Sequence, residues 1–146
     1  MKWINFIYGI AISLVLTLFL YLGYKSVLRK FEFTNSEFIG VKYFYYNWTI
    51  ILYIFFGVIG SFLSLRKIKL SLFFLLSLGF YEIFRRLFLV EINLVGITEI
   101  IIIISYFIIL FSNKMRIEYT LKIKELITYS CISLLILSLI IIIKRS

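Results

Sequence analysis

Four ionisable side chains interrupt hydrophobic stretches of this sequence. Glu82, Arg85 and Arg86 stand at positions i, i+3 and i+4, so a helix would carry all three on one face. Glu99 lies in the next hydrophobic run. Charged groups inside a membrane are rare, and they mark ion paths or polar contacts between helices. The spacing predicts an intramembrane charge network in which Glu99 pairs with Arg85 or Arg86 and Glu82 completes the set.

Three roles are open for such a network. It could conduct protons or small ions, or it could act as a polar clamp that fixes helix register or docks a partner. In the third role, the arginines reach lipid headgroups from a short or tilted helix. If helices span 70–90 and 94–112, Glu82 lies about 3 Å and Glu99 about 6 Å from the membrane midplane.

The residues available for catalysis are few. The sequence contains no His and no Asp, which excludes Ser-His-Asp triads and His-based zinc or haem sites. Its single cysteine, Cys131, lies in an apolar run, where we expect a buried structural thiol. No spacing joins a nucleophile to a base. We therefore predict a protein that is not an enzyme and that uses no cofactor and no metal.

The elements that must position these charges are hydrophobic helices. Hydrophobic residues make up 63% of the chain, against about 45–50% in soluble domains, and the mean hydropathy is +1.08. The apolar runs are continuous and long enough for helices to cross a bilayer, and they lack the alternation of barrel strands. We predict an all-α integral membrane helical bundle, one transmembrane domain over 1–146, with about five spans near 3–24, 48–65, 70–90, 94–112 and 126–143.

The third run differs from the other predicted crossings, because its second half holds the charged residues. The alternative is four spans plus one interfacial or re-entrant helix. In the connection before the second span, Thr34 and Glu37 have capping-box spacing, which predicts a short helix from Glu37. The alternating charges of 113–125 are typical of a solvated or interfacial helix.

Two further residue sets are predicted to shape the bundle. Amphipathic aromatic rings around the start of the second span favour the membrane interface. The alternative is that these rings form a platform that binds carbohydrate. Small residues recur in the first two runs and favour close packing of helices, either within the chain or in a dimer. The interfacial aromatics are Tyr43, Tyr45, Tyr46 and Trp48, and the small packing residues are Gly9, Ser13, Thr17, Gly57, Gly60 and Ser61.

The net charge is +9, and most of the lysine and arginine residues stand at the ends of the hydrophobic runs. We therefore expect these residues to contact lipid headgroups and not nucleic acid. Eight basic residues fall on the amino-terminal side against six on the other, or eight if Arg85 and Arg86 reach the interface, which favours a cytoplasmic amino terminus. The scarcity of residues with GC-rich codons indicates an AT-rich genome. We expect a bacterial cytoplasmic membrane or an organellar inner membrane.

With almost no soluble mass, the chain is predicted to be a helical subunit of a larger membrane complex or a homo-oligomer. One alternative is a toxin-immunity or phage-defence membrane protein. The other is a conductor of protons or small ions through the four charged residues.

Overall fold

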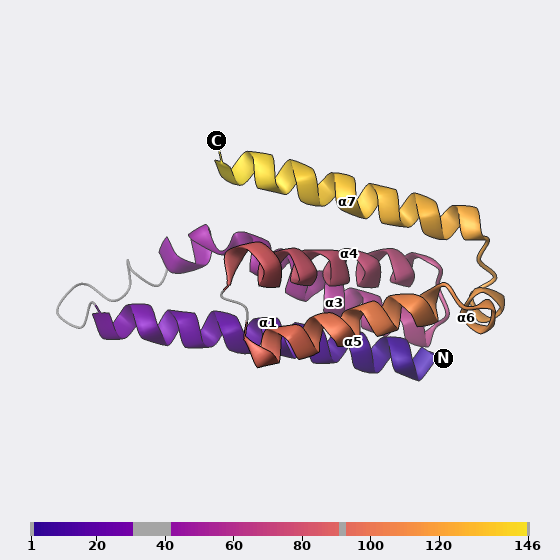
Figure 1. The fold of residues 1–146 in the computed structure, drawn as a ribbon, viewed down its shortest axis with the longest axis horizontal. Helices are drawn as coiled ribbons and strands as arrows, with labels where there is room; N and C mark the ends of the chain where they lie inside the picture. The colour runs from indigo at the N-terminus through magenta and orange to yellow at the C-terminus, as the bar shows by residue number, and fades with distance from the viewer. Residues whose placement is uncertain (1, 31–41, 91–92, 146) are drawn as a thin grey trace.

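A computed structural model of the chain describes residues 2–30, 42–90 and 93–145. The described part is helical and holds no strand. Successive long helices run in opposite directions, side by side along the longest axis of the molecule (Figure 1). Their bounds are α1 (Lys2–Lys30), α3 (Trp48–Leu65), α4 (Leu70–Phe84), the π-helical η1 (Arg85–Leu89), α5 (Leu94–Leu110), α6 (Asn113–Glu118) and α7 (Ile123–Arg145), and residues 42–46 form one more short helical segment.

The centre of the bundle is α4. It packs against α1, α3, α5 and α7, whereas α7 packs chiefly against α4. Leu72, Leu75, Leu76 and Leu78 of α4 are fully buried. These leucines, together with buried serine, tyrosine and glycine, cover most of the circumference of α4, and a helix apolar all round belongs in an interior.

Small side chains bring α1 and α3 into close contact. A Cβ atom added to Gly9 of α1 would lie 2.9 Å from the backbone oxygen of Gly57 in α3, and one added to Gly57 would lie 1.9 Å from the Ser13 hydroxyl. Ser61 of α3 lines the same contact, and its hydroxyl would clash with a Cβ atom added to Gly9. These small residues therefore pack within the chain. Gly60 instead faces Phe74 and Leu75 of α4, and Thr17 is exposed, with its hydroxyl donating to the Ser13 carbonyl.

Three helices are long and apolar enough to cross a membrane, namely Lys2–Val27, Trp48–Leu65 and Ile123–Lys144, which is fewer than the five expected. The difference arises in the middle of the chain. The helix α5 has 17 residues, and α4 has 15 before the π-helical turn that carries the two arginines. The expected helix from Glu37 lies outside the described residues.

Two other expectations change in the structure. Cys131 is exposed on the outer side of α7 and is not a buried thiol, because α7 turns a different face to α4. In the polar stretch 113–125, residues 113–118 form the short helix α6, Thr120 follows with a φ of 50°, and residues 123–125 already belong to α7. A left-handed conformation stops a helix, so a turn separates α6 from α7 and the stretch is not one continuous helix.

The four aromatic residues lie around the start of α3. Tyr45 and Tyr46 are exposed, and Trp48 is the first residue of α3. The Tyr43 hydroxyl donates to the Leu20 carbonyl of α1 over 2.9 Å, so this ring also ties α1 to the start of α3.

Candidate functional site

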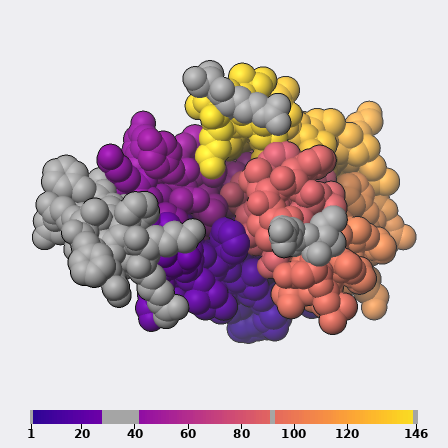
Figure 2. Space-filling view, turned by 60° about the vertical axis from the view of Figure 1, so that its left-hand side comes forward, coloured from indigo at the N-terminus to yellow at the C-terminus, as the bar shows by residue number. Residues whose placement is uncertain are grey.

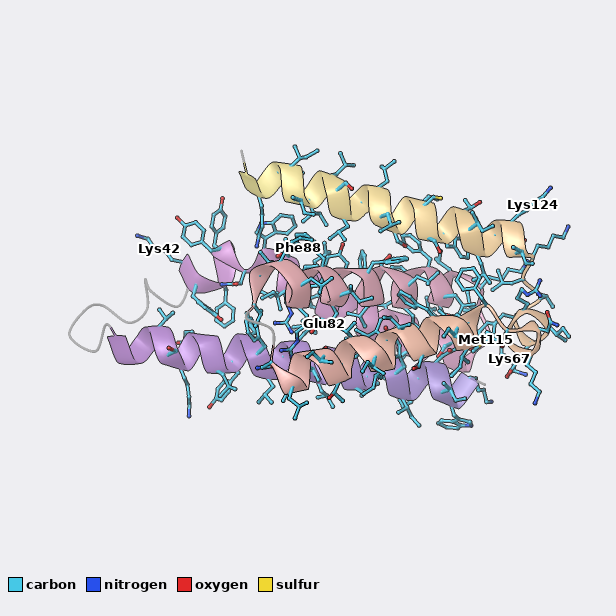
Figure 3. The ribbon with its side chains drawn as sticks, in the orientation of Figure 1. Lys42, Lys67, Glu82, Phe88, Met115 and Lys124 are labelled. Atoms are coloured by element: carbon cyan, nitrogen blue, oxygen red, sulfur yellow. The ribbon has the colours of Figure 1, made fainter. Side chains whose placement is uncertain are left out.

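The charged site begins where α4 gives way to a π-helical turn. Residues Arg85 to Leu89 take the wider π-helical winding, which is rare and occurs often at functional sites. Glu82 stands one turn earlier on α4, and its side chain points into the bundle (Figure 3). The η1 segment ends at Leu89, and Asn93 caps the start of α5 by accepting a hydrogen bond from the Gly96 amide over 2.8 Å.

Glu82 and Arg85 form a pair within one helix. Arg85 Nε donates to Glu82 Oε2 over 2.9 Å, and Arg85 Nη2 donates to Glu82 Oε1. The Arg85 side chain is 1% exposed, and the Glu82 side chain is 0% exposed. The Arg85 guanidinium also lies 4.3 Å from the centre of the Phe19 ring of α1, a cation–π distance. Arg85 is therefore held between a carboxylate of its own helix and a ring of α1.

Arg86 joins α4 to α5. Its Nε donates to Glu99 Oε2 over 2.6 Å and lies 3.6 Å from Glu82 Oε1. Arg86 Nε therefore contacts both carboxyl groups, and its positive charge offsets the two like charges. Two carboxylates and two guanidinium groups give a formal charge of zero, which is the condition for keeping such groups away from water.

The structure brings the four predicted charged residues together. Glu99 pairs with Arg86, one of the two partners expected for it, while Arg85 takes Glu82. The small residues and the aromatic residues predicted from the sequence lie outside this charge cluster, at the α1–α3 contact and around the start of α3.

A second polar cluster, centred on Asn5, was not anticipated. Tyr106 of α5 donates to Asn5 Oδ1 over 2.8 Å, and Asn5 Nδ2 donates to the Tyr119 hydroxyl over 2.9 Å. The Tyr119 hydroxyl donates in turn to the Ser64 carbonyl at the end of α3. Met115, in the α6 segment, contributes a buried sulfur to Asn5 (Figure 3). A single amide near the start of a hydrophobic run was the signal for this cluster, because it must find partners inside the bundle.

Removing the Tyr119 hydroxyl is expected to lower the stability of the fold by a measurable amount. Tyr119→Phe should lower the free energy of unfolding by about 1–2 kcal/mol, because the Asn5 amide and the Ser64 carbonyl both lose a partner. Unfolding in detergent, followed by circular dichroism, measures the change. Tyr45→Phe, at an exposed ring, is the matched control and should stay within about 0.5 kcal/mol of the parent. Equal losses for the two variants would contradict this reading.

A groove runs between α1 and α5, which make few contacts with each other. It consists of two adjoining hollows of about 430 and 400 Å³. Ala11, Ile12 and Ile102 line both hollows. Arg86 and Glu99 line the second hollow, and Tyr106 the first. This α1–α5 groove therefore connects the level of the charge cluster with the level of the Asn5 cluster.

Not every buried polar atom near the groove is satisfied. Glu99 Oε1, Arg85 Nη1 and the Tyr8 hydroxyl find no hydrogen-bond partner among the residues that the structure describes. Tyr8 stacks on Tyr106 with ring centres 3.6 Å apart. In the described ranges, no three acidic or cysteine side chains gather as metal ligands would. The arrangement can thus hold charges and accept a hydrogen-bond donor at Glu99.

Comparison with known proteins adds no further constraint, since no family model, curated protein or solved structure matches the chain.

Proposed function

We propose that the chain is a five-helix membrane protein and works as a non-enzymatic subunit that associates with a second copy of itself through α7. Two features support the two further crossings. The segment α4 with η1 extends over residues 70–89, about 30 Å of helix, and α5 adds about 26 Å. Both run antiparallel to their neighbours in the bundle (Figure 1).

The observation that carries the proposal is the free side of α7. At 3.6 residues per turn, Leu126, Ser133 and Leu137 share one face of α7, and this face is buried. The opposite face carries a stripe of exposed residues at heptad spacing. This α7 stripe consists of Thr128, Cys131, Leu135, Ser138 and Ile142.

The α7 stripe suits contact with an identical stripe. Helices in lipid associate by close packing, and small residues at the contact let their backbones approach. Thr128, Cys131 and Ser138 are small, whereas Leu135 is large and 62% exposed. In a two-fold symmetric contact the same patch is used on both copies, so the large side chains of one copy can lie beside the small ones of the other.

The charge cluster supports a structural role over conduction. Each carboxylate accepts from a guanidinium group, and arginine stays protonated in proteins. Paired in this way, the four residues clamp α4 to α5. We expect the subunit in a bacterial cytoplasmic membrane or an organellar inner membrane.

Cross-linking at the native Cys131 tests the proposal. Oxidation of membranes that contain the protein should give a disulfide-linked dimer of the 17.4 kDa chain on a non-reducing gel. Cys131→Ser should abolish the dimer, and adding Ser138→Cys to that variant should restore it. Leu137→Cys in the same background is the matched control, since this position faces α4 and should stay monomeric.

Two results would overturn the proposal that the chain associates with a second copy of itself. One is a monomer for every cysteine position. The other is equal cross-linking at 137 and 138, which would indicate random collision. Cross-links from both stripe positions to a different polypeptide would keep the subunit role and replace the second copy by another protein.

A further inference from the structure

The α1–α5 groove has enough volume to hold a lipid chain. Each hollow has room for on the order of a dozen methylene-sized groups, at about 30 Å³ each. A helix is about 10 Å across and would need far more room to enter. The walls are apolar, built largely from isoleucines together with Ala11. In Figure 2, α1 lies on the side of the bundle opposite α7, and no α7 residue lines the groove, so its occupant is independent of the contact proposed for α7.

One end of the groove is polar and incomplete. Glu99 lines the groove there and is 6% exposed. Its Oε2 accepts from Arg86, and its Oε1 has no partner in the described parts of the chain. A buried carboxylate oxygen without a donor is costly, particularly beside a second carboxylate such as that of Glu82. The missing partner is therefore a hydrogen-bond donor, and a positively charged donor suits it best.

Glu99 lies nearer the start of α5 than its end, so a lipid headgroup would enter the groove from the Asn93 end. It stands six residues after Asn93, so it is about 9 Å along the helix axis from the start of α5. The apolar hollow extends from there towards Tyr106. A molecule with a cationic donor at one end and a hydrocarbon chain at the other would match both features.

We propose that the α1–α5 groove binds one molecule of phosphatidylethanolamine. Its ammonium group donates to Glu99 Oε1, and one of its acyl chains lies along Ala11, Ile12 and Ile102. The ammonium carries N–H donors, whereas the trimethylated head of phosphatidylcholine carries none. The two lipids therefore differ at the atom that Glu99 recognises.

Native mass spectrometry of the whole protein tests the proposal. The protein is purified from nanodiscs that contain equal amounts of the two lipids, and the lipid retained after mild activation is identified. One phosphatidylethanolamine should be retained, about tenfold over phosphatidylcholine, as expected for one charge-assisted hydrogen bond. Equal retention of the two lipids would overturn the proposal.

Variants locate the lipid on the protein. Ala11→Phe places a ring in both hollows and should abolish retention, while Ile108→Phe adds a ring to an exposed position of α5 outside the groove and should leave retention unchanged. Glu99→Gln should remove the preference between the lipids. Retention that survives Ala11→Phe in a folded variant would place the lipid elsewhere and overturn the proposal. So would a copurifying polypeptide seated in the groove in place of lipid.

Discussion

Replacing Glu82 with methionine is expected to lower the free energy of unfolding by about 3–5 kcal/mol. Arg85 is 1% exposed, and its guanidinium donates twice to the Glu82 carboxylate. Without that carboxylate the charge of Arg85 would stay buried, or α4 would have to shift to hydrate it. Unfolding of the purified protein in detergent, with helix content followed by circular dichroism, measures the loss.

The double variant Glu82→Met with Arg85→Met is the control. Removing both side chains leaves neither charge buried without its partner. Well-packed apolar side chains of similar volume are often tolerated in place of a buried ion pair. The double variant is therefore expected to recover most of the stability that the single variant loses. If it instead loses as much as the two single variants together, the two residues are not coupled and the cluster does not act as described.

Gly57→Val is the second change with a large expected effect, about 3 kcal/mol of unfolding free energy. The added Cβ alone would lie 1.9 Å from the Ser13 hydroxyl and 3.1 Å from the backbone oxygen of Gly9. Because backbone is among the atoms in the way, side-chain rotation cannot relieve the contact and α1 must move away from α3. Thermal unfolding in detergent should show a lower midpoint.

Ala11→Val adds comparable bulk to α1 at an exposed position that lines the α1–α5 groove and lies outside the contact with α3. Its stability should stay within about 0.5 kcal/mol of the parent. If Gly57→Val were equally mild, the close contact between α1 and α3 would not hold in solution.

Part of the charge cluster could be predicted from the sequence. Glu82, Arg85 and Arg86 share a helix face because of their spacing alone, and Glu99 follows in the next run, so an antiparallel pair brings it to a similar depth. The choice of Arg86 over Arg85 could not be predicted. It depends on the π-helical turn and on Phe19, which comes from α1, more than sixty residues earlier in the chain.

Other features depend on contacts that local patterns do not contain. The run around Cys131 has apolar residues on every side, so its pattern does not distinguish the face towards α4 from the exposed face. The hydropathy pattern also predicts a third span that continues to residue 90, whereas the regular α-helix α4 ends at Phe84. Asn5 was recognisable as a lone amide, yet its partners come from α5 and from the residue after α6, and only the fold brings them near.

In the five-helix membrane arrangement proposed above, the pairing of Arg86 with a residue thirteen positions later bears on how the chain enters the bilayer. Glu82 and Arg85 neutralise each other within a single turn, so that part of α4 can leave the translocon with its charge already balanced. Arg86 shares the single Glu82 carboxylate with Arg85, so one positive charge stays unbalanced until Glu99 has been synthesised. The segment from α4 to α5 is therefore expected to partition into lipid as one hairpin, released only after both arms have emerged from the ribosome.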